Sequence, residues 1–173
     1  YADRMAANAA QACAEAGVPR VKLLRPAWEP VEGDFWLNED SASGAAGRLA
    51  ELPHRRVFLA TGAKEIAVYR ALTEHRFLVR LIEAPAGPLP LANHDLVLGR
   101  GPFDEEAEAD LLRDHSIEVL VSKNSGGQAT YAKIAAARRL ELPVIMIDRP
   151  PPPPGETVES VEDALAWIQA RIA

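Results

Sequence analysis

A series of short apolar runs constrains the fold of this chain most strongly. Runs of this kind, apolar at nearly every position, are typical of strands buried on both faces, as in parallel sheets covered by helices. Amphipathic segments of helical periodicity separate the runs. We therefore predict an α/β fold with a mostly parallel sheet. The predicted strands span residues 21–24, 57–60, 77–82, 96–98, 119–121 and 144–147, and the predicted helices span 1–16, 48–52, 64–72, 104–115, 129–140 and 161–172.

The alternation of strands and helices is more regular in some parts of the chain than in others, which suggests how the chain is divided into lobes. Residues 26–51 contain two tryptophans and a Gly/Ser-rich stretch without clear periodicity, so we interpret them as a connector between two lobes. Residues 1–25 are then the end of a preceding lobe, and residues 52–173 form the main lobe. Five prolines at 150–154 predict a rigid strut before the last helix, with a proline-rich docking peptide as the alternative.

Composition excludes several classes of function. A formal net charge of −6 over 173 residues argues against a nucleic-acid-binding protein, and no apolar run approaches the ~20 residues that cross a bilayer. One cysteine rules out a disulfide framework within the chain and fits a cytoplasmic setting. The four histidines lack the spacing of metal ligands, so we expect no metal site. Nothing here assigns an oligomeric state.

Ligands of open parallel sheets bind beyond the C-terminal ends of the strands, and one such segment is rich in polar groups. It runs from Ser122 to Gln128, with Lys123, Asn124 and Ser125 followed by Gly126 and Gly127. Successive backbone amides at such a turn can cradle an anion, and Thr130 and Lys133 follow in the next helix. The alternative is a tight turn in which glycine is needed only for its backbone conformation.

Three further strand ends carry cations or hydroxyls. Thr61, Gly62 and Lys64 open a helix after the strand at 57–60, where Thr61 is either a ligand contact or only an N-cap. Arg100 follows another strand and can bind a carboxylate or phosphate in bidentate fashion. Arg80 interrupts an apolar strand, so it is either buried against a carboxylate or directed at a ligand. An acidic protein that gathers cations at one sheet edge is expected to bind a polyanionic small molecule.

In its ordered motifs the chain resembles the precorrin-6A reductases of cobalamin biosynthesis and their relatives, the cobalt-precorrin-6A reductases. The resemblance extends over nearly the whole chain. It is carried by Tyr1-Ala2, Arg25-Pro26-Ala27-Trp28, Val57 to Gly62 with Lys64, Leu78 to Leu81, Arg100 to Phe103, Lys123 to Gly127, Lys133, and Leu142 to Pro150.

This resemblance implies an oxidoreductase that transfers hydride from NADPH to the tetrapyrrole ring of precorrin-6A, giving precorrin-6B. It also implies two Rossmann-like lobes, of which this chain has one and a fragment of the other. We expect the polycarboxylate tetrapyrrole to be the small-molecule partner. The expected catalytic residues are Lys123 and Lys64, either of which would supply the proton or orient a water that does so. The expected substrate contacts are Arg80, Arg100, Asn124, Ser125, Gly126, Gly127, Thr130 and Lys133, and the expected cofactor contacts are Tyr1, Thr61 and Gly62.

The sequence departs from the family pattern at two places. The glycine-rich nucleotide loop of the family's N-terminal lobe is absent, and Phe35 replaces a basic residue that often precedes the tryptophan. Alternative interpretations are therefore a non-catalytic module that binds a tetrapyrrole or nucleotide, and a different α/β enzyme acting on a phosphorylated metabolite.

Overall fold

The computed structural model describes residues 3–152 and 154–172 and divides into two compact units. One unit consists of residues 28–149, and the other combines residues 1–27 with 150–173. Each unit contains its own parallel sheet. The predicted α/β class is therefore confirmed.

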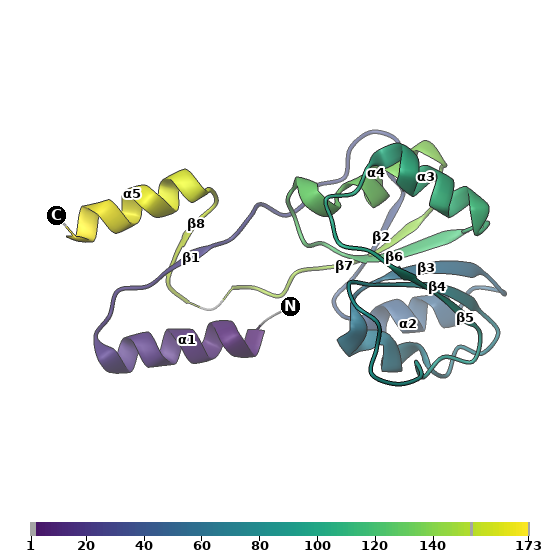
Figure 1. The fold of residues 1–173 in the computed structure, drawn as a ribbon, viewed down its shortest axis with the longest axis horizontal. Coiled ribbons are helices and arrows are strands. Elements are labelled where there is room, and N and C mark those ends of the chain that lie inside the picture. The colour runs from purple at the N-terminus through teal and green to yellow at the C-terminus, as the bar shows by residue number, and fades with distance from the viewer. Residues whose placement is uncertain (1–2, 153, 173) are drawn as a thin grey trace. The chain divides into compact units, whose positions relative to one another are not determined.

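The larger unit is built on six parallel strands in the order β2-β7-β6-β3-β4-β5 (Figure 1). Chain order proceeds outward from β3 through β4 to β5, and then returns to the other side of β3 with β6. This reversal is the kind of switch point at which open α/β sheets bind ligands. The strands are β2 (Trp36–Glu39), β3 (Arg56–Ala60), β4 (Arg76–Leu81), β5 (His94–Leu98), β6 (Val119–Lys123) and β7 (Val144–Ile147).

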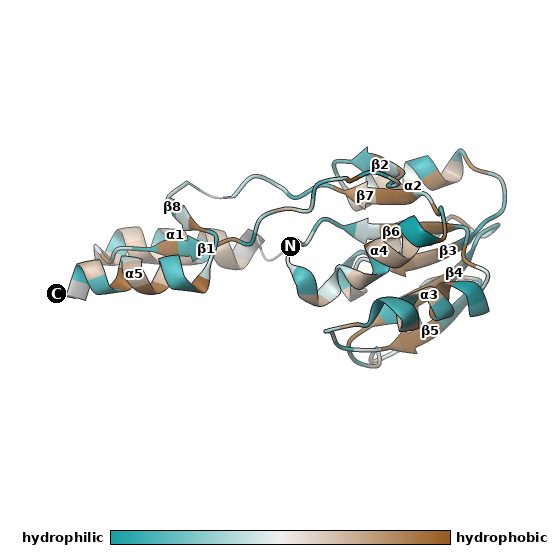
Figure 2. Ribbon diagram, turned by 90° about the horizontal axis from the view of Figure 1, so that it is seen from above, coloured by the Kyte–Doolittle hydropathy of each residue, from teal (hydrophilic) through white to brown (hydrophobic). Residues whose placement is uncertain are grey.

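Helices cover both faces of this sheet. Alternate strand residues form two core clusters, one against α2 (Ala42–Ala50) and the 3-10 segment η1 (Ala63–Tyr69), the other against α3 (Glu105–Asp114) and α4 (Ala132–Arg139). In Figure 2 the strands are mostly hydrophobic, whereas α3 carries hydrophilic segments. A short 3-10 turn, η2 (Gln128–Thr130), precedes α4.

Local sequence explains where α3 and α2 begin. The Asp104 carboxylate accepts a hydrogen bond from the backbone N–H of Ala107 at 3.1 Å, and three glutamates in the first turn of α3 favour its dipole. In α2, the Ser41 hydroxyl accepts a hydrogen bond from the backbone N–H of Gly44, also at 3.1 Å.

The smaller unit pairs segments from both ends of the sequence. Strand β1 (Val21–Leu23) pairs in parallel with β8 (Glu156–Val158), and the unit also contains α1 (Asp3–Ala16) and α5 (Val161–Ile172). The Arg20 guanidinium donates to the Pro154 carbonyl at 2.7 Å.

The observed units correct the predicted division of the chain. Residues 36–50 are not a connector, because β2 pairs with β7 and α2 packs on the sheet. Residues 150–173 do not belong to the larger unit, because β8 pairs with β1. Both errors arise because the strands involved are only three or four residues long and contain polar positions, so their sequences show little strand periodicity. Their pairing with distant segments leaves no pattern in the neighbouring sequence.

Candidate functional site

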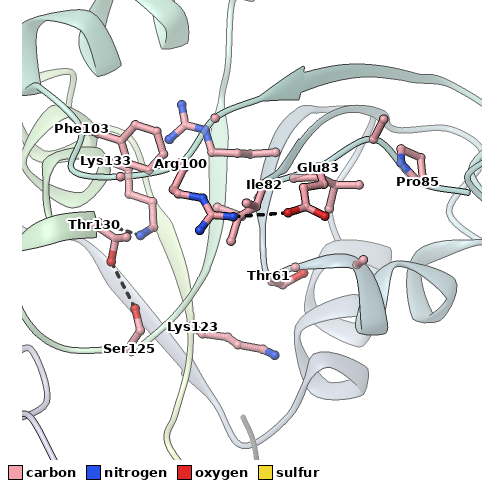
Figure 3. Close-up of a pocket in the computed structure, with 18 residues that line it drawn as sticks. Thr61, Ile82, Glu83, Pro85, Arg100, Phe103, Lys123, Ser125, Thr130 and Lys133 are labelled. Atoms are coloured by element: carbon pink, nitrogen blue, oxygen red, sulfur yellow. Dashed lines mark hydrogen bonds and ion pairs between the residues drawn. The ribbon is translucent and has the colours of Figure 1, made fainter.

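The larger unit contains a pocket at the C-terminal ends of β3, β4, β5 and β6 (Figure 3). Its volume is about 710 Å³, within the range of small-molecule sites. It lies at the predicted ligand edge of the sheet, and four basic residues line it. The polar and charged lining residues are Thr61, Arg80, Glu83, Arg100, Lys123, Ser125, Thr130 and Lys133.

Two of the cations in this pocket form ion pairs that a ligand can replace. Arg100 lies 3.3 Å from the Glu83 carboxylate, and both side chains are largely exposed. The Lys123 ammonium lies 2.6 Å from a Glu65 carboxylate oxygen in a half-buried pair. Because exposed ion pairs contribute little free energy, a carboxylate of a ligand can compete for Arg100 at small cost, whereas at Lys123 it has to displace a mostly buried Glu65 carboxylate.

Arg80 is held rigidly in the pocket wall. Its guanidinium donates two hydrogen bonds to the buried Glu108 carboxylate, at 2.7 and 2.6 Å. It also lies 4.8 Å from the Phe58 ring centroid and 4.2 Å from that of Phe103. Its Nε is buried without a hydrogen-bond partner. Both interpretations of Arg80 therefore have support, since it is paired with a carboxylate and also lines the pocket.

Lys133 is almost entirely buried at the same pocket, with 5% of its surface exposed. Its ammonium donates to the Thr130 carbonyl at 2.7 Å and lies 4.8 Å from the Trp28 ring centroid. Burial lowers the pKa of Lys133 to about 8; the nearby Glu108 charge raises that pKa and the Arg80 charge lowers it. Lys133 is thus an ammonium group that can release its proton near neutral pH.

Hydroxyl groups complete the polar lining. Ser125 and Thr130 lie 3.4 Å apart through their side-chain oxygens. The Thr61 Oγ1 atom is buried and has no hydrogen-bond partner. The predicted N-cap role of Thr61 is not observed, because Gly62 occupies that position without a side-chain cap.

Other predicted site residues lie outside the pocket lining. The Asn124 amide exchanges hydrogen bonds with the backbone of Trp28, at 2.8 and 2.9 Å, and the Gly127 carbonyl accepts from the Trp28 indole at 2.9 Å. These contacts fix Trp28 beneath Lys133. Gly126 and Gly127 adopt positive φ angles of 66° and 75°, as the tight turn requires.

One further expectation is not supported by the geometry. Lys64 is exposed and is not one of the residues lining the pocket, so it does not face Arg100 and Lys123 as expected. Tyr1 lies outside the described residues.

Sequence reasoning did not identify the partners that organise the cations. Glu65 pairs with Lys123, Glu83 with Arg100, and Glu108 with Arg80. Each partner comes from a different element from its cation, so sequence spacing gave no signal. Glu108 lies in the acidic first turn of α3, yet it is only 3% exposed.

The described residues contain neither a metal-binding cluster nor a membrane-spanning helix. No group of three or more His, Cys, Asp or Glu side chains in these ranges is arranged to hold a metal ion. In the same part of the chain, no helix has the length and apolar character to cross a membrane.

Comparison with known proteins identifies the family of the chain. The family model described as precorrin-6x reductase CbiJ/CobK matches residues 1–169. The chain belongs to this family. Its relatives include a precorrin-6A reductase of Sinorhizobium sp, 44% identical over 168 residues that cover 97% of this chain and 64% of the relative. The precorrin-6A reductase of Rhodobacter capsulatus is 39% identical, with 97% of this chain and 66% of the relative covered.

A solved structure has the same fold. It is named CobK precorrin-6A reductase and superposes with a TM-score of 0.92 at 39% sequence identity, covering 98% of this chain and 67% of that one. The chain thus spans about two thirds of the length of these family members.

Proposed function

We propose that the full-length protein is an NADPH-dependent precorrin-6A reductase and that the pocket in residues 28–149 binds the acidic tetrapyrrole. The observation that carries this proposal is the convergence of Arg80, Arg100, Lys123 and Lys133 on one cavity in an acidic protein. Precorrin-6A is the substrate named for the relatives. A cationic cavity complements a ring bearing many carboxylates.

Arg100 and Lys123 are proposed to bind substrate carboxylates directly. Both line the pocket, and each already holds one carboxylate, from Glu83 and Glu65. The planar guanidinium suits bidentate binding. Arg80 contributes its positive charge to the pocket wall, and the Ser125 and Thr130 hydroxyls supply further hydrogen bonds.

Asn124, Gly126 and Gly127 are proposed to act indirectly. They shape the loop after β6, and Asn124 and Gly127 hold Trp28 through the hydrogen bonds described above. Their effect on the substrate is then through the position of Lys133, which lies over the Trp28 ring.

The cofactor contacts are proposed at Thr61 and Gly62, with Tyr1 retained from the family resemblance. The orphaned Thr61 Oγ1 fits a ligand with hydrogen-bonding groups, because this buried hydroxyl otherwise satisfies none of its capacity. NADPH supplies a hydride when bound. The residues of this chain orient the ring, exclude water and provide the accompanying proton.

The test is reduction of precorrin-6A by the full-length protein, followed as loss of NADPH absorbance. Arg100→Ala and Lys123→Ala should each lose about 1.5–3 kcal/mol of binding, or roughly 10- to 100-fold in kcat/KM, because each removes a charge-assisted hydrogen bond. Arg70→Ala is the matched control: Arg70 is exposed and is not part of the pocket lining.

Three outcomes would contradict the proposal. Wild-type protein that binds precorrin-6A without oxidising NADPH indicates a non-catalytic module. Failure to bind any tetrapyrrole favours a different α/β enzyme. Equal losses in Arg70→Ala and the pocket variants would show that the cavity is not the binding site. Parallel assays with metal-free and cobalt-loaded substrate distinguish the two reductase classes.

A further inference from the structure

Lys133 differs from the other three cations of the pocket in its partners. Arg80, Arg100 and Lys123 each form an ion pair with a carboxylate. Among the described residues, the contacts of the Lys133 ammonium are with neutral groups, the Thr130 carbonyl and the Trp28 ring. A buried ammonium without a carboxylate partner is costly, because burial removes its hydration. Such an arrangement favours loss of the proton.

The proposed reaction requires a proton at this site. Addition of a hydride to one atom of the conjugated ring leaves an electron pair that must be captured by a proton. Arginine cannot donate a proton at ordinary pH, which excludes Arg80 and Arg100. The Lys123 ammonium is held 2.6 Å from Glu65, on the side of the pocket formed by the segment after β3. The remaining nitrogen acid is Lys133.

We propose that Lys133 is the catalytic acid that protonates the ring as it is reduced. This inference rests on the proposed function. In the step, an N–H bond of the Lys133 ammonium breaks and a C–H bond forms at a ring carbon, while the hydride forms the second new C–H bond. Lys133 is left as a neutral amine and regains a proton from solvent before the next turnover. The balance is one NADPH and one proton consumed for each ring reduced.

The surroundings of Lys133 suit this role. The charged groups that face it are Glu108 from α3 and Arg80 from β4, which are paired with each other. With these charges largely balanced, burial against Trp28 dominates and lowers the pKa of Lys133 to about 8. A general acid is most effective when its pKa lies near the working pH.

The experiment compares full-length wild-type protein with Lys133→Arg, Lys133→Met and Lys123→Met. Lys133→Arg keeps the positive charge but cannot donate the proton. We expect KM close to wild type and kcat lowered about 10²- to 10⁴-fold, the contribution of a general acid. We expect the wild-type kcat/KM to fall above about pH 8, the Lys133 pKa of the free protein, and expect this fall to be absent in Lys133→Arg. We expect the Lys123→Met variant to retain this fall in kcat/KM.

A second readout does not depend on turnover. Binding of precorrin-6A without NADPH, followed by the absorbance of the ring, should be nearly unchanged in Lys133→Arg, and circular dichroism should show native folding. Normal binding with low kcat is the expected combination.

Failure of the proposed function and failure of the Lys133 assignment give different results. Wild-type protein that does not reduce precorrin-6A overturns the proposed function and this inference together. Active wild-type protein with a flat pH profile to pH 10, or with undiminished kcat in Lys133→Arg, overturns this inference alone. Loss of the high-pH fall in Lys123→Met instead would assign the acid to Lys123. If a Lys133 variant does not fold, the wild-type and Lys123→Met profiles together still test the inference: a fall that Lys123→Met retains supports it, and a flat wild-type profile overturns it.

Discussion

Arg80 shows how a single charged residue can serve both the core and the site. Its charge is paired with Glu108 and enclosed by the Phe58 and Phe103 rings, so the side chain has one fixed position. The buried ion pair thus holds the Arg80 charge in the pocket wall without a further entropic cost of ordering.

At the residue scale, we predict that Glu108→Gln destabilises the protein by about 3–5 kcal/mol, because it leaves the Arg80 charge buried without a counter-charge. The measurement is urea unfolding of the full-length protein. Glu106→Gln is the control on the same helix, since Glu106 pairs with Arg139 at the surface. A Glu108→Gln protein as stable as this control would show that the buried pair is dispensable.

At the element scale, the pocket depends on close contact between the loops after β5 and after β6. Phe103 N donates to the Ala129 carbonyl at 3.3 Å, and a Cβ added at Gly101 would lie 2.6 Å from the same carbonyl oxygen. Glycine at position 101 thus permits a backbone approach that no other residue allows. The contact sets the spacing between Arg100 and the Thr130–Lys133 segment.

We therefore predict that Gly101→Ala separates these loops and costs about 1–3 kcal/mol of stability, as overpacking does. It should also weaken the proposed binding of precorrin-6A, measured by absorbance titration alongside thermal unfolding. Gly87→Ala is the control, because an added Cβ there meets nothing within 4 Å. Native-like binding and stability in Gly101→Ala would mean that the loops adjust freely.

At the scale of the whole molecule, burial of Lys133 links stability to pH. Below about pH 8 Lys133 is charged in both the folded and the unfolded protein, so folding pays the desolvation cost. Between about pH 8 and 10.5 the folded protein carries the neutral amine while the unfolded chain still binds the proton, so this cost falls as pH rises.

We predict that the free energy of unfolding of wild-type protein rises by about 3 kcal/mol relative to Lys133→Met across this window, at 1.36 kcal/mol per pKa unit. Paired denaturation curves at several pH values measure this difference, in which the titration of other groups cancels. A constant difference between the two proteins would show that Lys133 keeps an ordinary pKa.

The sequence by itself determined the α/β class, most of the strands and helices of the larger unit, and the edge of the sheet at which cations gather. These features are local: an apolar run, helical periodicity or a glycine after a strand expresses its preference within a few residues. The strand at 144–147 was predicted with its observed bounds.

Only the tertiary structure decided which cations act together. Lys64 and Lys123 looked equivalent as lysines at strand ends, yet one is exposed and the other lines the pocket. Likewise, only pairing across more than a hundred residues placed β8 beside β1. Burial, ion-pair partners and strand pairing depend on which distant segments the folded chain brings together, and no neighbouring residue in the sequence encodes that information.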